Sequence, residues 1–189
     1  MNNSASGKLP GSNAVYRRQL DASIPAELNS VLAFYRRELG KRGWTESVER
    51  TVVQADRAQL AFTSPDGPAM LKLGRSKDET SVILAQKYPA VAAKADFVPK
   101  PGQAKLMLGN VGESEAAVTI NKQTIKLAAG AGGLQSPRPP VLELPPGKYR
   151  YSMKVAGRPA RNDMIEVTAD DGWGLIILPS GEALSMQMY

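Results

Sequence analysis

The chain has 189 residues and contains neither histidine nor cysteine. Their absence removes the commonest general base near neutral pH, the thiol nucleophile and any disulfide framework, so we expect no enzyme activity. Lys and Arg number 24 against 18 Asp and Glu, and this net charge of +6 favours anionic partners.

Residues 1–13 are rich in Asn, Ser and Gly and predict a flexible arm. They lack the basic start and apolar stretch of a secretory signal. No apolar run reaches the length of about 18 residues that spans a bilayer, so we expect no transmembrane segment. The chain either works in the cytoplasm or begins after a removed signal or lipoprotein anchor. We favour the second alternative, a periplasmic or extracellular protein.

An amphipathic helix is predicted early in a first domain of residues 14–88. Ser23 is the expected N-cap, and Pro25 is expected at or near the first helical position. Either Gly40 or Gly43 can end the helix, which would have about five turns. Its apolar face is built from residues spaced three and four apart: Leu28, Val31, Leu32, Tyr35 and Leu39.

After Trp44 the hydrophobic period changes from helical to alternating, which predicts strands. Pro65, Asp66 and Gly67 mark the clearest turn between them. We expect a four-stranded antiparallel sheet with the helix on one face, an α+β unit. Its strands are predicted near residues 46–54, 57–63, 69–75 and 80–87.

Residues 89–102 read as a linker, and residues 103–189 as an all-β domain of immunoglobulin-like sandwich type. The run Leu175–Leu178 lacks alternation, which is typical of a strand buried on both faces. The eight candidate strands lie near 104–109, 115–121, 123–128, 141–144, 148–156, 163–168, 173–178 and 183–188.

Three short motifs in this second half resemble one bacterial family. They are Ile120-Asn121-Lys122-Gln123, then Leu144-Pro145-Pro146-Gly147-Lys148-Tyr149 after a Gly-rich stretch, and Val155-Ala156-Gly157. Over about 50 residues the pattern is similar to the PEGA-type β domains of bacterial envelope proteins, although Lys122 stands where that family usually has glycine. The resemblance implies a non-catalytic surface or periplasmic module.

Two groups of residues are candidate binding sites. A basic group at the helix end and the preceding segment could contact phosphates or anionic lipid, although it also suits the helix dipole and a solvated surface. It comprises Arg17, Arg18, Arg36, Arg37, Lys41 and Arg42. A Gly-rich loop that runs into prolines is expected to be a long flexible connection rather than a phosphate cradle. Its candidate contacts are Gly130, Gly132, Gly133 and Arg138.

The remaining motifs point to no catalytic, cofactor or metal site. Asp170 and Asp171 match a tight turn better than a calcium loop, which needs six to eight oxygen ligands. The sequence therefore predicts a non-enzymatic binding or scaffolding module of the bacterial cell envelope, with a protein or envelope polymer as partner. The alternative is a basic protein that binds nucleic acid or anionic lipid through the helix end.

Overall fold

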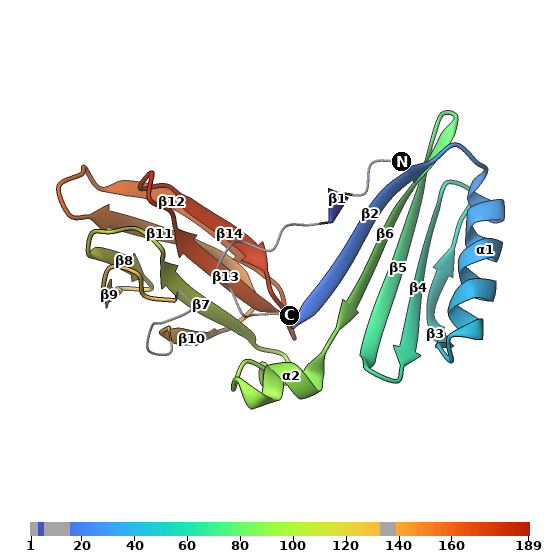
Figure 1. The fold of residues 1–189 in the computed structure, drawn as a ribbon, viewed down its shortest axis with the longest axis horizontal. Helices are drawn as coiled ribbons and strands as arrows, with labels where there is room; N and C mark the ends of the chain where they lie inside the picture. Colours follow the sequence, from blue (N-terminus) through green and yellow to red (C-terminus); the bar gives the residue numbers. More distant parts are fainter. Residues whose placement is uncertain (1–3, 6–15, 133–138) are drawn as a thin grey trace. The chain divides into compact units, whose positions relative to one another are not determined.

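A computed structural model describes residues 4–5, 16–132 and 139–189, and these are mostly in β-strands (Figure 1). The chain divides between Val91 and Ala92 into two compact units. Each unit has a hydrophobic core of its own. We call residues 4–5 and 16–91 the first unit, and residues 92–132 and 139–189 the second unit.

The first unit is a six-stranded antiparallel sheet in the order β1-β2-β6-β5-β4-β3, with helix α1 against one face. The other face carries no helix among the described residues (Figure 1). The elements are β1 (Ser4–Ala5), β2 (Arg17–Ile24), α1 (Leu28–Lys41), β3 (Thr45–Val53), β4 (Arg57–Ser64), β5 (Gly67–Ser76) and β6 (Glu79–Lys87).

Helix α1 confirms the predicted apolar face but begins later than the sequence suggested. All five predicted apolar residues are buried, and they pack on Leu60, Leu71 and Val82 of the sheet. The N-cap is Glu27, without a side-chain cap, so the prediction of Ser23 as N-cap is wrong. Ser23 pairs with Ser81 of β6 instead, because strand β2 continues to Ile24.

The expected four-stranded sheet is also corrected, because β2 adds a long strand beside β6. Its alternating residues Leu20, Ala22 and Ile24 lie on the helix side of the sheet, opposite Leu84, Val82 and Thr80. The hydroxyl of Thr80, which is buried, donates to the backbone oxygen of Ala26 at 2.7 Å. This contact fixes the connection between β2 and α1.

Strand β3 is irregular at the free edge of this sheet. Its register shifts from Ser47 opposite Ala61 to Val52 opposite Gln59, so the four residues between Ser47 and Val52 run against Leu60 alone. The extra residues form a bulge, which interrupts regular pairing at an edge. Thr51 holds the bulge by donating to Glu46 at 3.1 Å and to the oxygen of Ser47 at 3.0 Å.

The second unit contains two four-stranded sheets, in the orders β10-β7-β13-β14 and β12-β11-β8-β9. Side chains from both sheets form one core cluster between them. All eight predicted strands of this half are present. They are β7 (Ala104–Asn110), β8 (Ala116–Ile120), β9 (Gln123–Leu127), β10 (Val141–Leu144), β11 (Gly147–Val155), β12 (Arg161–Val167), β13 (Gly172–Ile177) and β14 (Ala183–Gln187).

Strand β13 is buried on both faces, as the run at its end predicted. Leu175 and Ile177 point into the core, and β13 pairs in parallel with β7 and antiparallel with β14. On the outer face the ring of Phe97 lies over Gly172, where an added Cβ would come within 2.5 Å of it. Phe97 is fully buried. It follows the short helix α2 (Pro89–Lys94), which occupies part of the segment expected to be a linker.

Candidate anion-binding surfaces

Three of the cations predicted at the helix end, Arg36, Arg37 and Lys41, are bound to carboxylates of the same unit. Arg36 makes a two-point contact with Glu46, at 2.9 Å from Nε and 2.8 Å from Nη2. Arg37 and Lys41 both donate to Glu38, at 3.0 and 3.1 Å. Three of the six predicted cations are therefore already paired with carboxylates.

These contacts shift the ionisation of the groups involved. The hydrogen bonds from Arg36 hold the pKa of Glu46 below its ordinary value, against the opposing effect of burial. The hydrogen bonds from Arg37 and Lys41 likewise lower the pKa of Glu38. The carboxylates are thus anchored in their charged form and offset the positive charge of the helix end.

The other predicted cations do not complete a cluster. Arg17 and Arg18 begin β2, and successive side chains of a strand point to opposite faces. Arg18 lies 5.6 Å from the ring centroid of Tyr88, a cation–π contact. Helix α1, which carries the other four predicted cations at or near its end, makes its main sheet contacts with β3, β5 and β6. Because Arg17 and Arg18 point to opposite faces of the sheet, the six predicted cations do not line one surface.

The described part of the Gly-rich loop is fixed by a buried asparagine that the sequence analysis did not single out. Asn110 is fully buried, and its Nδ2 donates to the backbone oxygens of Ser114, Leu127 and Ala128 at 2.8 to 3.3 Å. Its Oδ1 accepts from the nitrogen of Gly112 at 3.1 Å. Nothing in the charge or periodicity near Asn110 signals this role.

Gly130 and Gly132 follow in left-handed backbone conformations, with φ of 72° and 91°. The nitrogen of Gly130 donates to the oxygen of Gly112 at 3.0 Å, so this part of the loop is tied to the strand end. The predicted contacts Gly133 and Arg138 lie outside the described residues.

A cationic surface that the sequence analysis missed lies on the outer face of the sheet β12-β11-β8-β9; we call it the β11 face. In β11 the outward side chains alternate with the core residues Tyr151, Met153 and Val155. Its charged members are the exposed residues Lys126, Lys148, Arg150, Lys154 and Glu166.

Strand geometry sets the spacing of these charges. Lys148 and Arg150 are two residues apart on one strand, and Lys154 follows four residues later, so they lie about 7 and 14 Å apart. Lys154 is opposite Ala117, and Ala117 is opposite Lys126, two strands away or about 10 Å. Lys148 lies 3.6 Å from Glu166, the carboxylate that the four strands themselves carry on this face.

A row of neutral polar groups crosses the β11 face between its cations. The hydroxyls of Thr119 and Thr124 are 2.8 Å apart. Ser152 lies opposite Thr119 on one side and Asn162 on the other, so the row spans all four strands. These hydroxyls and the amide can donate and accept hydrogen bonds. The face therefore offers positive charge together with polar groups on a regular strand spacing.

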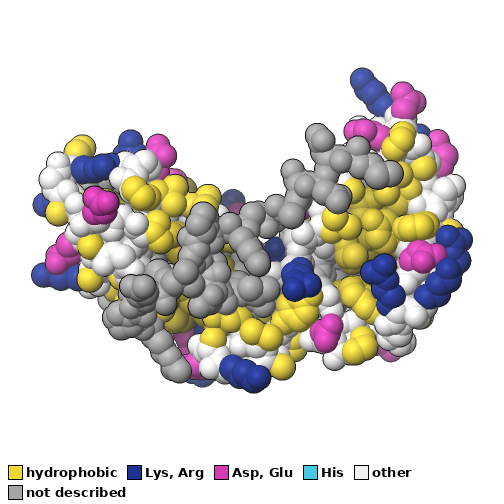
Figure 2. All heavy atoms as spheres, viewed as in Figure 1, with side chains coloured by type: hydrophobic (Ala, Val, Ile, Leu, Met, Phe, Trp, Pro, Cys, Tyr) yellow, Lys and Arg dark blue, Asp and Glu magenta, His cyan; other side chains and the backbone are white. Residues whose placement is uncertain are grey.

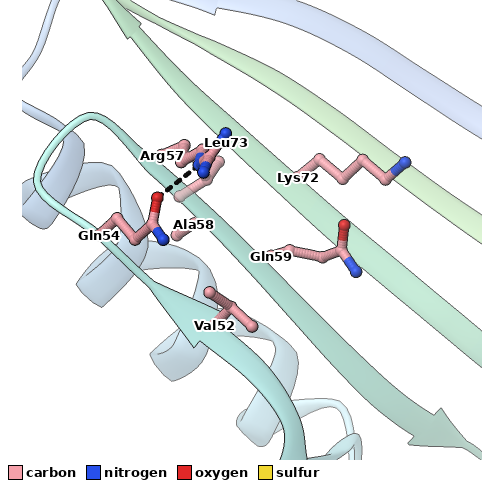
Figure 3. A pocket seen from close by; sticks show the side chains of 7 residues that line it. All are labelled: Val52, Gln54, Arg57, Ala58, Gln59, Lys72 and Leu73. Atoms are coloured by element: carbon pink, nitrogen blue, oxygen red, sulfur yellow. Dashed lines mark hydrogen bonds between the residues drawn. The ribbon is translucent and has the colours of Figure 1, made fainter.

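A shallow depression of about 340 Å³ lies at the β3–β4 hairpin of the first unit (Figure 3). Arg57 donates from Nε to Oε1 of Gln54 at 2.5 Å, a contact drawn in Figure 3. The lining of this depression contains two cationic residues and no carboxylate, whereas the β11 face has four cationic residues. The lining residues are Val52, Gln54, Arg57, Ala58, Gln59, Lys72 and Leu73.

Lys and Arg side chains are distributed over both units on the face shown in Figure 2, with Asp and Glu among them. In the described ranges no three acidic side chains gather into a group that could hold a metal ion. No helix in the described part of the chain has the length and apolar content needed to span a bilayer.

Comparison with known proteins identifies no family. No protein-family model matches the chain, and no curated protein matches it. Among solved structures, the N-terminal domain of AlgF from P. aeruginosa is similar at 20% identity, over 47% of this chain and 95% of that domain. The TM-score of 0.34 is too low to carry an argument about fold or function.

Proposed function

We propose that the protein is a non-enzymatic binding module that holds an acidic polysaccharide on the β11 face. The observation that carries the proposal is the set of four exposed cations, Lys126, Lys148, Arg150 and Lys154, with Glu166 as the one outward carboxylate within the four strands. Clustered surface cations attract polyanions and raise their local concentration. The earlier alternative, binding through the helix end, is less well supported because Glu38 and Glu46 pair with its cations.

The neutral groups of the face favour a sugar polymer over nucleic acid. Thr119, Thr124, Ser152 and Asn162 can exchange hydrogen bonds with sugar hydroxyls. Sequence-tolerant binding of single strands instead relies on aromatic side chains that stack on bases. The outward positions of β8, β9, β11 and β12 carry no aromatic residue.

We further propose a location in the bacterial cell envelope, which the resemblance of the 120–157 region to PEGA-type domains supports. We also propose that the two sheets of the second unit are arranged as in an immunoglobulin-like sandwich. An acidic envelope polymer would be the natural partner in that compartment.

Binding of the full chain to polygalacturonate, with neutral dextran and single-stranded DNA as comparisons, tests the function. We expect polygalacturonate to bind, dextran not to bind, and the affinity to fall steeply with salt. The double variant R150Q/K154Q should weaken binding about tenfold and reduce the slope of log K against log salt by about two. Isothermal titration calorimetry across a salt series measures both quantities.

The matched control removes two cations from the helix end by R37Q/R42Q, with the same change in net charge. This control should retain binding. Equal losses in the two double variants would refute the β11 face as the site, and salt-independent binding would refute the electrostatic mechanism. Stronger binding to single-stranded DNA than to polygalacturonate would favour the nucleic-acid alternative.

A further inference from the structure

Strand β14 is an edge strand of the second unit without the features that usually prevent edge pairing. It ends the order β10-β7-β13-β14, and no described strand pairs with its outer side. Its residues Ala183–Gln187 include no charged residue, proline or glycine. An exposed regular edge of this kind is a template for pairing with another strand.

Every other terminal strand longer than two residues carries such a feature. Strand β3 has charged residues and the bulge after Ser47. Strand β12 has Arg161, Asp163 and Glu166, and β9 has Lys126. The short strand β10 contains Glu143 and is flanked by prolines. The contrast singles out β14.

The hydrogen-bond register defines which groups of β14 point outward. The nitrogen of Met188 donates to Gly172, and the nitrogen of Leu178 donates to the oxygen of Glu182. Since bonding alternates along an antiparallel pair, Leu184 and Met186 direct their backbone groups toward β13. The backbone groups of Ala183, Ser185 and Gln187 therefore point away from the sheet.

We propose that a second copy of this chain pairs with β14 in antiparallel orientation, centred on Ser185, to form a symmetric dimer. In this register Leu184 lies opposite Met186 of the partner subunit, and Ala183 lies opposite Gln187 of the partner subunit. Leu184 is 38% exposed, so the pairing covers apolar surface. The strand complements itself because no like charges meet, as a two-fold interface requires.

Two variants test the dimer in the full chain. S185P removes an outward N–H and leaves the bonds to β13 in place, since proline is tolerated where the lost donor faces away from the sheet. L184K places like charges near the two-fold axis. S185A is the matched control, because it keeps the N–H.

Sedimentation velocity across a concentration series measures the mass, and circular dichroism with thermal unfolding verifies the fold. We expect wild type and S185A to reach twice the chain mass of 20.3 kDa, and S185P and L184K to stay at that mass. A wild type that is monomeric throughout would overturn the proposal, as would two folded variants that remain dimeric. Polygalacturonate binding is measured separately, so a monomer that still binds refutes only the dimer.

Discussion

At the scale of single residues, Asn110 shows how one buried amide organises a loop. It satisfies three carbonyl oxygens and one backbone N–H at a position with no solvent exposure. Buried polar groups left without partners cost about 1 to 3 kcal/mol each. Asn110 therefore anchors the connection after β9 that leads into the Gly-rich loop.

We expect Asn110→Asp to destabilise the second unit by about 3 kcal/mol at neutral pH, because a buried carboxylate would face three carbonyl oxygens. Part of the loss should be recovered at acidic pH, where a protonated carboxyl can donate one hydrogen bond. Urea unfolding at both pH values measures the effect. Asn162→Asp at an exposed position is the control, and a loss of equal size in it would contradict the explanation.

The ion pair of Arg36 and Glu46 makes the stability of the first unit depend slightly on pH. The pKa of Glu46 is lowered by folding, so its contribution is present above the pKa of the unfolded chain and is lost as pH falls through the folded value. We expect Glu46→Gln to cost about 0.5 kcal/mol at pH 7, since the pair is partly exposed. The cost should fade between about pH 5 and pH 2. Thermal unfolding at several pH values measures the difference in stability between wild type and Glu46→Gln. A difference that stays constant with pH would contradict this explanation.

At the scale of elements, the β8–β9 hairpin places a lysine where glycine fits better. Asn121 and Lys122 both have left-handed backbones, with φ of 49° and 63°. Two consecutive residues of this kind form the turn that prefers Asn-Gly. The left-handed backbone at Lys122 therefore carries a conformational cost.

Lys122→Gly should stabilise the second unit by about 0.5 to 1 kcal/mol. The substitution removes the steric cost of a side chain on a left-handed backbone, and part of this gain is offset because glycine loses more conformational entropy on folding. Lys126→Gly, in the regular strand β9, is the matched comparison and should destabilise by a similar amount. Chemical denaturation compares the two variants. Destabilisation by both would show that the turn is not strained at Lys122.

Local sequence patterns predict most helices and strands here, because the spacing of apolar residues along the chain matches the buried face of the folded element. The five apolar residues of α1 and the alternation in β11 each describe one buried face. The length of strand β2 was not predicted, because Ser23 and Pro25 have the chemistry of a helix start and only pairing with β6 extends the strand to Ile24. The bulge in β3 cannot be recognised from the local sequence, because it depends on the register with the partner strand β4.

At the scale of the whole molecule, the candidate site depends on contacts between distant segments. Arg36 and Glu46 are ten residues apart, and their pairing removes charge from the surface that the sequence favoured. The β11 face joins Lys126 to Lys154 through Ala117, a relation that only the strand order supplies. A net charge of +6 predicts anionic partners, but it does not say which cations remain unpaired.

The parallel pairing of β7 with β13 has a consequence for how the second unit is made. Lys105 lies opposite Gly172, so the centre of one sheet joins the beginning and the end of the unit. Closing so long a segment is entropically costly, and folds dominated by distant contacts form slowly. We therefore expect β7 to lack one of its two neighbouring strands until β13 has been synthesised. Until then its apolar residues would be incompletely buried, which is the condition that favours aggregation of a partly folded chain.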